Sequence, residues 1–463
     1  MGLLHRARQG LVGLSRSLPA YRLIPSPRHR DYAAVHYLQK TRPAEIPKYL
    51  ITTGRLPDLR LSTLRMAARA AFDQGRDELL ERILDRARQR YPEDAETHIL
   101  QADLAAFQGH YEQALQAAET AWLLTPDSAD AARRTVRLAA MNAENGPGEA
   151  TDQLSLDAMR AFPHAGPVLW AACKNCASRA QFQRIHELWR EQCAGSSQAI
   201  AAGGRPIANA ALRAGECGTA LDILAETALL ELRGEGVGTP VREKRLRGRR
   251  SRSVIEDLRE VLDSAGIRWF LAAGTALGII RDGRPLDHDS DIDVGVFDQD
   301  WDRERIVQAF RAHPAFDFDL PHPHNPKLGL IHRAGAAIDL FRYYREGEFL
   351  YHDGVFVRWF NRPFELEEHQ FGKKRVLVPA NPEQYLTENY GDWRTPDPEF
   401  DAFVEGPNAE TKWPEYQQVH RMRRAYKFIR AHDFLRAREE LGHIRTSLEQ
   451  SVHGPELARE LAL

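Results

Sequence analysis

The chain has 463 residues, too many for one ordinary hydrophobic core, so its length favours two or three domains. Hydrophobic residues make up 43% and charged residues 28% of it, which excludes an intrinsically disordered chain. The formal net charge of −2 excludes a chain-wide field for nucleic-acid binding, and no stretch reaches the ~20 apolar residues of a membrane span. The chain has only four cysteines, too few for a disulfide-stabilised scaffold, and this low number favours a reducing compartment.

The N-terminal residues 1–18 mix leucines with arginines and lack the unbroken apolar run of a signal peptide. This pattern fits either a short amphipathic helix on an anionic membrane surface or a basic arm. We therefore expect a cytoplasmic protein, with peripheral contact at the inner face of the membrane as a further hypothesis.

Residues 59–237 are rich in Ala, Leu and Arg, with apolar residues three or four positions apart, which predicts an all-helical region. Gly75 and Gly109 are 34 residues apart, and so are Pro92 and Pro126, which is the period of a tetratricopeptide repeat (TPR). We predict a TPR-like helical solenoid that binds a protein partner or braces a neighbouring domain. A rigid spacer without a ligand is the alternative.

Residues 238–253 form the most basic stretch, with seven Arg or Lys residues against one Glu. Such a run fits a site for an anionic lipid-linked acceptor or a membrane surface, and equally a solvated helix start or linker. We interpret it as a domain boundary.

Strand-like segments dominate beyond this boundary. An amphipathic helix at 254–267 leads to strands at 268–274 and 291–297, which flank a short helix at 275–283. Further strands are predicted at 328–333, 336–344, 348–352, 355–360 and 374–379. Asn381, Pro382 and Gly391 mark the start and stop of a last helix. This order predicts an α+β domain with a mixed sheet.

Two aspartates interrupt the apolar strand at 291–297. Asp291 and Asp293 are two positions apart, so both point to one face while Ile292 and Val294 point to the other. Two carboxylates side by side repel each other, and a divalent cation relieves that repulsion. Asp339 lies in the strand-like run 336–344, and a neighbouring strand would bring it to the same cation. The sequence therefore predicts a Mg²⁺ or Mn²⁺ site.

Gly274 and Thr275 end one strand and open a helix. Backbone N–H groups and the helix dipole at such a point suit a phosphate group. A glycine turn, two acids on the next strand and a third acid further on form the plan of a nucleotidyltransferase-type site.

The stretch GTALGIIRDGRPLDHDSDIDVGV, residues 274–296, resembles the signature of the LicD/fukutin family. Matching positions are held by Gly278, Arg281, Asp289, Asp291 and Asp293. The resemblance runs over about residues 253–393 and includes the later segment FELEEHQFGKKRVLVPANPEQYLTENYGDW. It departs from the family pattern at His288, where an aromatic residue is usual, and at Ser290, which replaces an aspartate.

The resemblance implies a nucleotidyltransferase fold used as a phosphotransferase. Such enzymes move a phosphorylated alcohol, such as phosphocholine or ribitol phosphate, from a CDP-linked donor to a hydroxyl of a cell-surface or lipid-linked glycan. The expected metal ligands are Asp291, Asp293 and Asp339. The expected contacts to donor phosphate are Gly274, Thr275, Arg281 and, from a loop that includes His322 and His324, Lys327. The general base is either Asp289 or Asp339.

Alternatives remain open. Arg281 can instead pair with Asp282 or Asp289. The same acids would also serve a nucleotidyltransferase that moves a nucleoside monophosphate, and the helical region could carry the function of an interaction protein with an inactive transferase domain. The domains expected are an N-terminal arm and lead-in (1–58), a TPR-like region (59–237), a basic linker (238–253), a LicD-like catalytic domain (254–415) and C-terminal helices (416–463).

Overall fold

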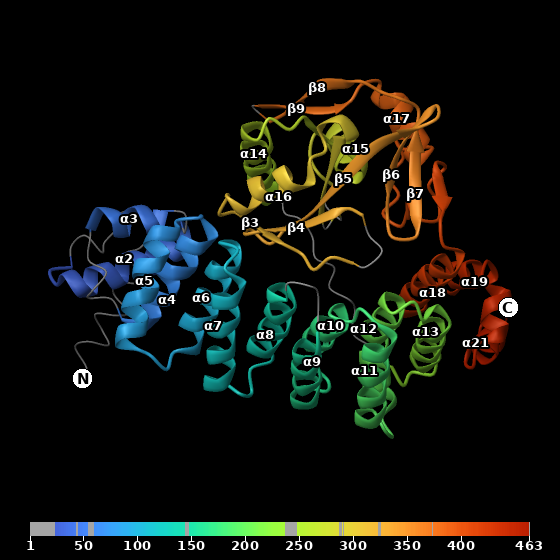
Figure 1. The fold of residues 1–463 in the computed structure, drawn as a ribbon, viewed down its shortest axis with the longest axis horizontal. Coiled ribbons are helices and arrows are strands. Elements are labelled where there is room, and N and C mark those ends of the chain that lie inside the picture. Colours follow the sequence, from blue (N-terminus) through green and yellow to red (C-terminus); the bar gives the residue numbers. More distant parts are fainter. Residues whose placement is uncertain are drawn as a thin grey trace. The chain divides into compact units, whose positions relative to one another are not determined.

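The computed structural model describes residues 24–42, 45–53, 60–143, 148–236, 248–286, 289, 291–322, 326–372 and 374–462. The predicted amphipathic arm, most of the basic stretch, His288, Ser290 and His324 lie outside the described residues. The chain divides into two compact units, Met1–Ala131 and Ala132–Leu463. A helical region is followed by a domain with a mixed sheet, as predicted (Figure 1).

Helices alone form the described part of the first unit. They are α2 (Pro27–Thr41), α3 (Ile46–Thr53), α4 (Leu61–Asp73), α5 (Asp77–Arg90), α6 (Ala95–Phe107) and α7 (Tyr111–Leu124). Gly75 turns the chain between α4 and α5 with φ 64°, and Gly109 does the same between α6 and α7 with φ 74°. These left-handed conformations explain why glycine recurs at this spacing. The rings of Phe72 and Phe107 meet edge to face, with centroids 5.4 Å apart.

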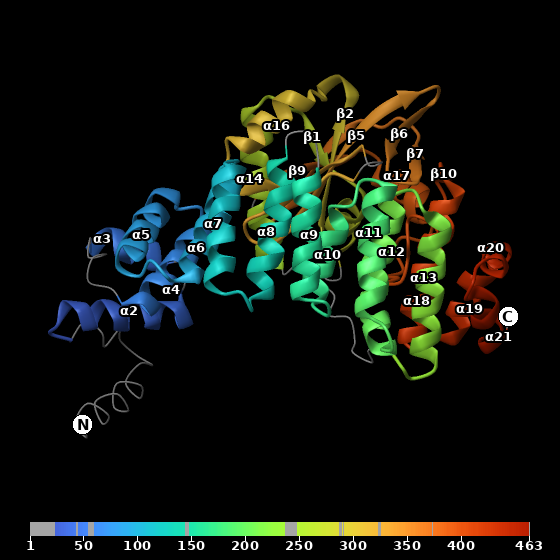
Figure 2. The ribbon, with the colours of Figure 1, turned by 60° about the horizontal axis from the view of Figure 1, so that its bottom comes forward.

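The second unit begins within a further set of helices, which lie side by side in Figure 2. They are α8 (Ala129–Asn142), α9 (Glu149–Ala161), α10 (Gly166–Lys174), α11 (Arg179–Gln192), α12 (Ser197–Arg213) and α13 (Cys217–Leu232). Hydrogen bonds connect alternate helices of this row. Asn175 Nδ2 donates to the carbonyl of Val136 (3.0 Å), and Arg213 Nε donates to the carbonyl of Cys176 (2.9 Å).

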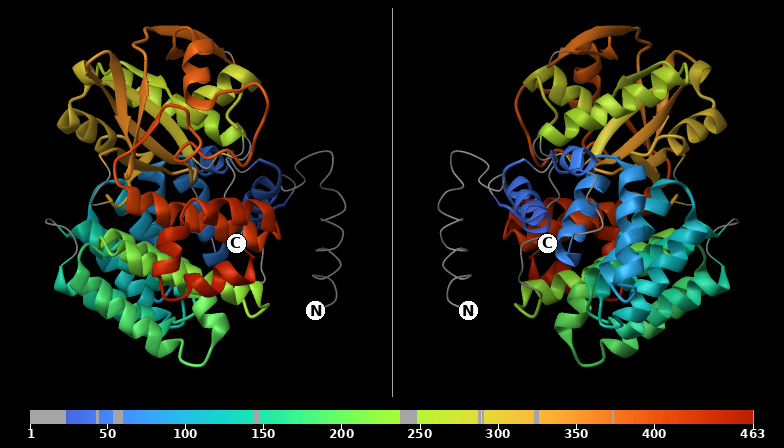
Figure 3. Two further views of the ribbon diagram at one scale, coloured as in Figure 1. Left: turned by 90° about the vertical axis from the view of Figure 1, so that its right-hand side faces the viewer. Right: turned by 90° about the vertical axis from the view of Figure 1, so that its left-hand side faces the viewer.

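The C-terminal helices return to this row of helices. They are α18 (Pro414–Arg430), α19 (Phe434–Gly442), α20 (Arg445–Gln450) and α21 (Gly454–Glu460). The Tyr416 hydroxyl donates to the carbonyl of Leu212 (2.5 Å), and the Tyr426 hydroxyl donates to Glu231 (3.2 Å). Figure 3 shows the red C-terminal helices beside the green helices of the row.

A mixed sheet organises the rest of the unit. Its strands are β1 (Trp269–Leu271), β2 (Asp291–Phe297), β3 (Phe316–Phe318), β4 (Leu328–His332), β5 (Ala337–Glu346), β6 (Phe349–Asp353), β7 (Val357–Asn361) and β10 (Ala409–Thr411). β2 and β5 run parallel and all other pairs in it are antiparallel. β8 (Leu366–Phe371) and β9 (Lys374–Pro379) form a separate hairpin.

The domain's helices are α14 (Gly248–Ser264), α15 (Ala273–Asp282), α16 (Arg303–Arg311) and α17 (Pro382–Tyr390). The strands predicted in the catalytic domain are confirmed, and so are Asn381 and Gly391 as the caps of α17. Asn381 accepts from the Gln384 N–H. α14 begins at Gly248, inside the stretch interpreted as a linker.

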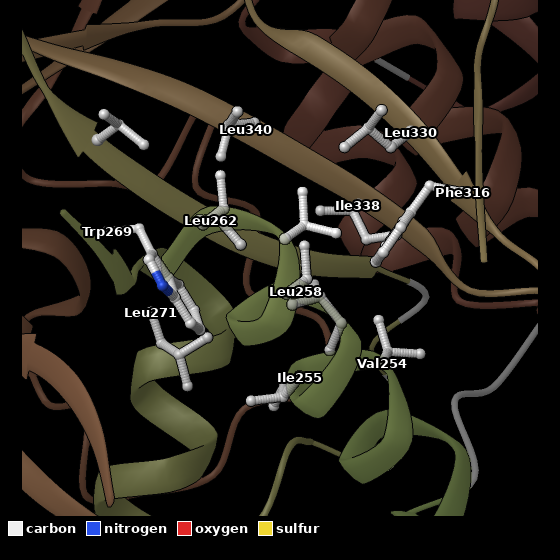
Figure 4. Packing of buried hydrophobic residues seen from close by; sticks show 14 of the residues in the cluster. Val254, Ile255, Leu258, Leu262, Trp269, Leu271, Phe316, Leu330, Ile338 and Leu340 are labelled. Atoms are coloured by element: carbon white, nitrogen blue, oxygen red, sulfur yellow. The ribbon is translucent and has the colours of Figure 1, made fainter. Parts of the chain in front are cut away.

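One face of the sheet builds the main core. In Figure 4, Val254, Ile255, Leu258 and Leu262 of α14 belong to one buried cluster with Ile338 and Leu340 of β5. Ile292, Val294 and Val296 of β2 join this core and are fully buried. Each such side chain contributes about 1.5–3 kcal/mol by burial, so β2 is held firmly from this side. The alternate residues of β2 and β5 must then face the other way.

No helix among the described residues has both the length and the apolar character that crossing a bilayer requires.

Gly295 allows β2 to lie against an aromatic cluster. A Cβ atom there would come within 2.3 Å of the Phe270 ring, which is packed against Phe297, Tyr343 and Phe364. We predict that Gly295→Ala lowers the free energy of unfolding by about 1–3 kcal/mol, because the ring has no room to move. Urea unfolding measures the change. Gly166→Ala is the matched control, since its Cβ meets nothing within 4 Å. A urea midpoint of Gly295→Ala equal to that of the parent would contradict the close packing of β2 on the Phe270 ring.

Candidate active site

Three carboxylates meet on the face of the sheet opposite the main core. The parallel register of β2 and β5 sets Asp293 beside Asp339, while Asp291 is two positions from Asp293 on the same face. One carboxylate oxygen from each of the three lies within 4.8 Å of the others. The structure therefore brings together the three residues predicted to bind a metal.

The turn at the start of α15 forms hydrogen bonds with both the side chain and the backbone of Asp293. The Gly274 N–H donates to Asp293 Oδ2 (3.1 Å), and the Asp293 N–H donates to Thr275 Oγ1 (2.9 Å). A Cβ at Gly274 would lie 3.0 Å from Asp289 Oδ2 and 3.4 Å from Asp293 Oδ2, so glycine fits between the two carboxylates. Thr275 is fully buried. Its contact to donor phosphate, like that of Gly274, stays a prediction.

Ala273, the first residue of α15, has a positive φ of 41°. This conformation is unusual for a residue with a Cβ and must be held by its surroundings. Its N–H donates to the Tyr385 hydroxyl (3.0 Å), and that hydroxyl lies 3.3 Å from the hydroxyl of Tyr343. Both tyrosines are buried. Tyr385 thus fixes the backbone that directs Gly274 at Asp293, a role that the helical pattern of 382–390 did not reveal.

Burial and like charges act together on this cluster. Burial, and then the carboxylates of Asp291, Asp289 and Asp339, raise the pKa of Asp293 well above its ordinary value. Burial also raises the pKa of Asp339, against the opposing effect of Lys327. The protein therefore keeps acids together in a place where their charged form is costly without a cation.

The side chain of Lys327 places one positive charge beside these acids. It precedes β4 and forms an ion pair with Asp339, and both side chains are mostly buried. The sequence predicted Lys327 as a phosphate contact on a loop, and the structure adds its pairing with the third acid.

The donor set fits a hard divalent cation. Three carboxylates converge with oxygen ligands, which Mg²⁺ and Mn²⁺ prefer, and the raised pKa of Asp293 indicates charge that protein groups alone do not compensate. The residues that would hold the ion are Asp291, Asp293 and Asp339.

A cavity of about 390 Å³ opens over these acids. Asp289, Arg281 and Lys327 line the same cavity as the three acids. The lining also contains many rings, which we call the aromatic wall; they belong to Phe341, His352, Trp359, Tyr390, Trp393, Phe400 and Phe403. The size suits a small-molecule ligand, and the lining combines charged with aromatic side chains. Two of these rings, Tyr390 and Trp393, lie at the end of α17 and just after it.

Arg281 lines this cavity, but its hydrogen bonds go to residues other than the three acids. Its guanidinium donates to both oxygens of Asp282 (3.0 and 3.1 Å) and to the Trp393 carbonyl (3.2 Å). The alternative pairing with Asp282 is therefore present, and a contact to phosphate stays a prediction. His352 stacks between Tyr343 and Trp359, and burial lowers its pKa to about 3, so it is neutral.

We predict that Asp293→Asn stabilises the metal-free protein. The raised pKa means that the folded state binds more protons than the unfolded chain above about pH 4, so Asp293 lowers stability as pH rises through this window. At pH 7.5 the variant should melt about 1–3 °C higher without metal, and Mn²⁺ should no longer raise its Tm. Differential scanning fluorimetry with and without Mn²⁺ measures both. A lower metal-free Tm with an intact Mn²⁺ response would contradict the site.

We predict a second effect from Tyr385→Phe, which removes the acceptor for the Ala273 N–H. The loosened turn should reduce the Mn²⁺-induced rise in Tm, because Gly274 no longer holds Asp293 in place. Adding Ala273→Gly should recover part of that rise, since glycine adopts a positive φ without strain. The measurement is the Tm of the parent, of Tyr385→Phe and of the double variant, each with and without Mn²⁺. An equal Mn²⁺-induced rise in Tm in all three proteins would refute the role of Tyr385.

Comparisons with known proteins agree with this geometry. Residues 266–381 match the family described as LicD/FKTN/FKRP, nucleotidyltransferase domain. The ribitol-5-phosphate transferase FKTN of Mus musculus is 25% identical over 189 residues, which cover 37% of this chain and 40% of the relative. The corresponding protein of Homo sapiens is 26% identical over 178 residues, which cover 35% of this chain and 37% of the relative. The chain thus spans about two fifths of the length of these relatives. The family match is thus confined to residues 266–381, the part of the chain that carries the three converging acids.

Proposed function

We propose that the protein is a metal-dependent phosphotransferase that moves a phosphorylated alcohol from a CDP-linked donor to a hydroxyl of a glycan. The observation that carries this proposal is the convergence of Asp291, Asp293 and Asp339 with Lys327 in one cavity of a LicD/FKTN/FKRP domain. The matched relatives bear the name ribitol-5-phosphate transferase, which supports ribitol phosphate or a similar phospho-alcohol as the transferred group.

Each group of the site has a part in this reaction. Bound Mg²⁺ or Mn²⁺ would neutralise the donor pyrophosphate and the charge that develops on the leaving CMP. Lys327 donates to a phosphate oxygen, and Gly274, Thr275 and Arg281 complete the phosphate contacts. The aromatic wall holds the flat base of the donor or the apolar face of a sugar.

The general base is Asp289 in this proposal. Asp339 is bound by Lys327 and belongs to the metal ligands, so its oxygens are already in use. Asp289 lines the same cavity, and its Oδ2 lies close to Gly274. A carboxylate there can accept the proton of an attacking hydroxyl.

The remaining regions have proposed parts as well. We propose that the helices belong to a TPR-like solenoid, which the left-handed Gly75 and Gly109 and their 34-residue spacing support. We also propose the domain limits expected from the sequence, with the catalytic domain at 254–415. The same proposal includes two further contacts. The basic stretch would contact an anionic lipid-linked acceptor at the inner face of the membrane, and the helices would bind a protein partner.

We predict CMP release from at least one of CDP-choline, CDP-ribitol, CDP-glycerol and CDP-ethanolamine when Mg²⁺ or Mn²⁺ is present. Asp291→Asn should lower the rate by about 100-fold or more, because the metal contributes several kcal/mol to the transition state. Asp298→Asn is the matched control, since Asp298 follows β2, is about half exposed and pairs with Arg342.

Other outcomes would change the assignment. Pyrophosphate release from nucleoside triphosphates, with no CMP from any donor, would replace the proposal with nucleotidyl transfer. Absence of any turnover together with absence of a Mn²⁺-induced rise in Tm would indicate an inactive domain.

A further inference from the structure

A short segment of the transferase domain is held by cations from three alternate helices. The segment is Asp317–Pro321, which comprises the end of β3 and the residues after it. The cations are Arg137 of α8, Lys174 of α10 and Arg213 of α12. We call this set of contacts the helical clamp.

The contacts of the helical clamp follow the order of the chain. Arg137 pairs with Asp317 and donates to the carbonyl of Phe318 (3.1 Å). Lys174 lies 3.3 and 3.4 Å from the two carboxylate oxygens of Asp319. Arg213 donates to the carbonyl of Pro321 (3.2 Å). Alternate helices thus bind positions that follow one another along a single segment.

The helices are built to present these cations together. Lys174 and Arg213 are the last residues of α10 and α12, where the helix dipole favours a positive charge. Asn175 ties the end of α10 to α8, and Arg213 ties the end of α12 to Cys176. These two hydrogen bonds connect the three helices that carry the cations.

The segment in turn is one strand away from the metal site. The Asp319 N–H donates to the carbonyl of Gly329 in β4 (3.0 Å), and Gly329 is opposite Asp339 in the β4–β5 register. A Cβ at Gly329 would lie 3.4 Å from the Cβ of Asp319, so the two chains pack closely. Lys327, directly before β4, pairs with Asp339.

β3 also needs support. It pairs with β4 and with no other strand in the described part of the chain, so it is an edge strand. Its Asp317 is only 2% exposed. A buried charge at a sheet edge depends on a partner, and Arg137 supplies one from outside the sheet.

We propose that the helical clamp positions Lys327 and Asp339 for catalysis, so that the ligand of α8, α10 and α12 is the transferase domain of the same chain. Arg137, Lys174 and Arg213 are positioning residues in this proposal, because the contacts described above join them to the segment Asp317–Pro321. This inference rests on the proposed metal-binding role of Asp339. It gives the helices α8, α10 and α12 a role in the geometry of the active site.

The first test measures hydrogen exchange and Mn²⁺ affinity in the full-length protein. Arg137→Met should speed exchange in β3 and β4 by about tenfold or more, as expected for a locally opened edge. It should also weaken Mn²⁺ binding by about 3- to 10-fold in isothermal titration without any donor. Arg137→Lys should recover part of both effects. Arg179→Met is the matched control, because Arg179 pairs with Glu216 inside the helical region.

The second test exchanges the charges of one pair and guards against a simple folding defect. Lys174→Glu and Asp319→Lys should each weaken Mn²⁺ binding, and the double variant should bind better than either single variant. Unchanged exchange in β4 on Arg137→Met, or a double variant no better than the single ones, would overturn the inference. If the parent protein binds no Mn²⁺, the proposed function fails, while the exchange data still decide whether the helical clamp holds β4.

Discussion

The parallel pairing of β2 with β5 is the contact on which the site depends. Its register places Asp293 next to Asp339, and a shift by one residue would turn each aspartate into the apolar core. Ile292, Val294, Ile338 and Leu340 oppose such a shift, because all are fully buried on the other face. The hydrophobic core thus fixes a group of carboxylates that repel one another, and its total burial energy is large compared with that repulsion.

A series of hydrogen bonds that begins at α17 also fixes the geometry of the site. Tyr385 comes from α17, far along the chain, and holds Ala273 in a conformation that alanine seldom adopts. Asp293 then receives a hydrogen bond from Gly274 and gives one to Thr275. The tyrosine on α17 and the glycine turn before α15 are therefore two parts of one arrangement, although more than a hundred residues separate them.

The sequence predicted much of this, for physical reasons that differ from residue to residue. Alternation of Asp with Ile and Val identifies β2 and the common direction of Asp291 and Asp293. The apolar run around Asp339 identifies β5, and Asn381 with Pro382 identifies the start of α17. Such features are local, so they can be read from neighbours in the chain.

Other features depend on distant partners and leave no local pattern. The positive φ of Ala273 is invisible because alanine normally favours a right-handed helix. The contacts of Arg137 and Lys174 look in sequence like ordinary surface charges on helices. The aromatic wall of the cavity gathers residues from several strands and from the loop after α17, and its members are separated by other elements.

The position of α14 bears on how the family domain folds. The family match begins at residue 266, whereas α14 ends at Ser264. Val254, Ile255, Leu258 and Leu262 of α14 nevertheless form one wall of the core under β2 and β5. A fragment cut at the limits of the match would leave the apolar face of its sheet open to water and prone to aggregate. The unit that folds is therefore larger than the unit that sequence similarity delimits.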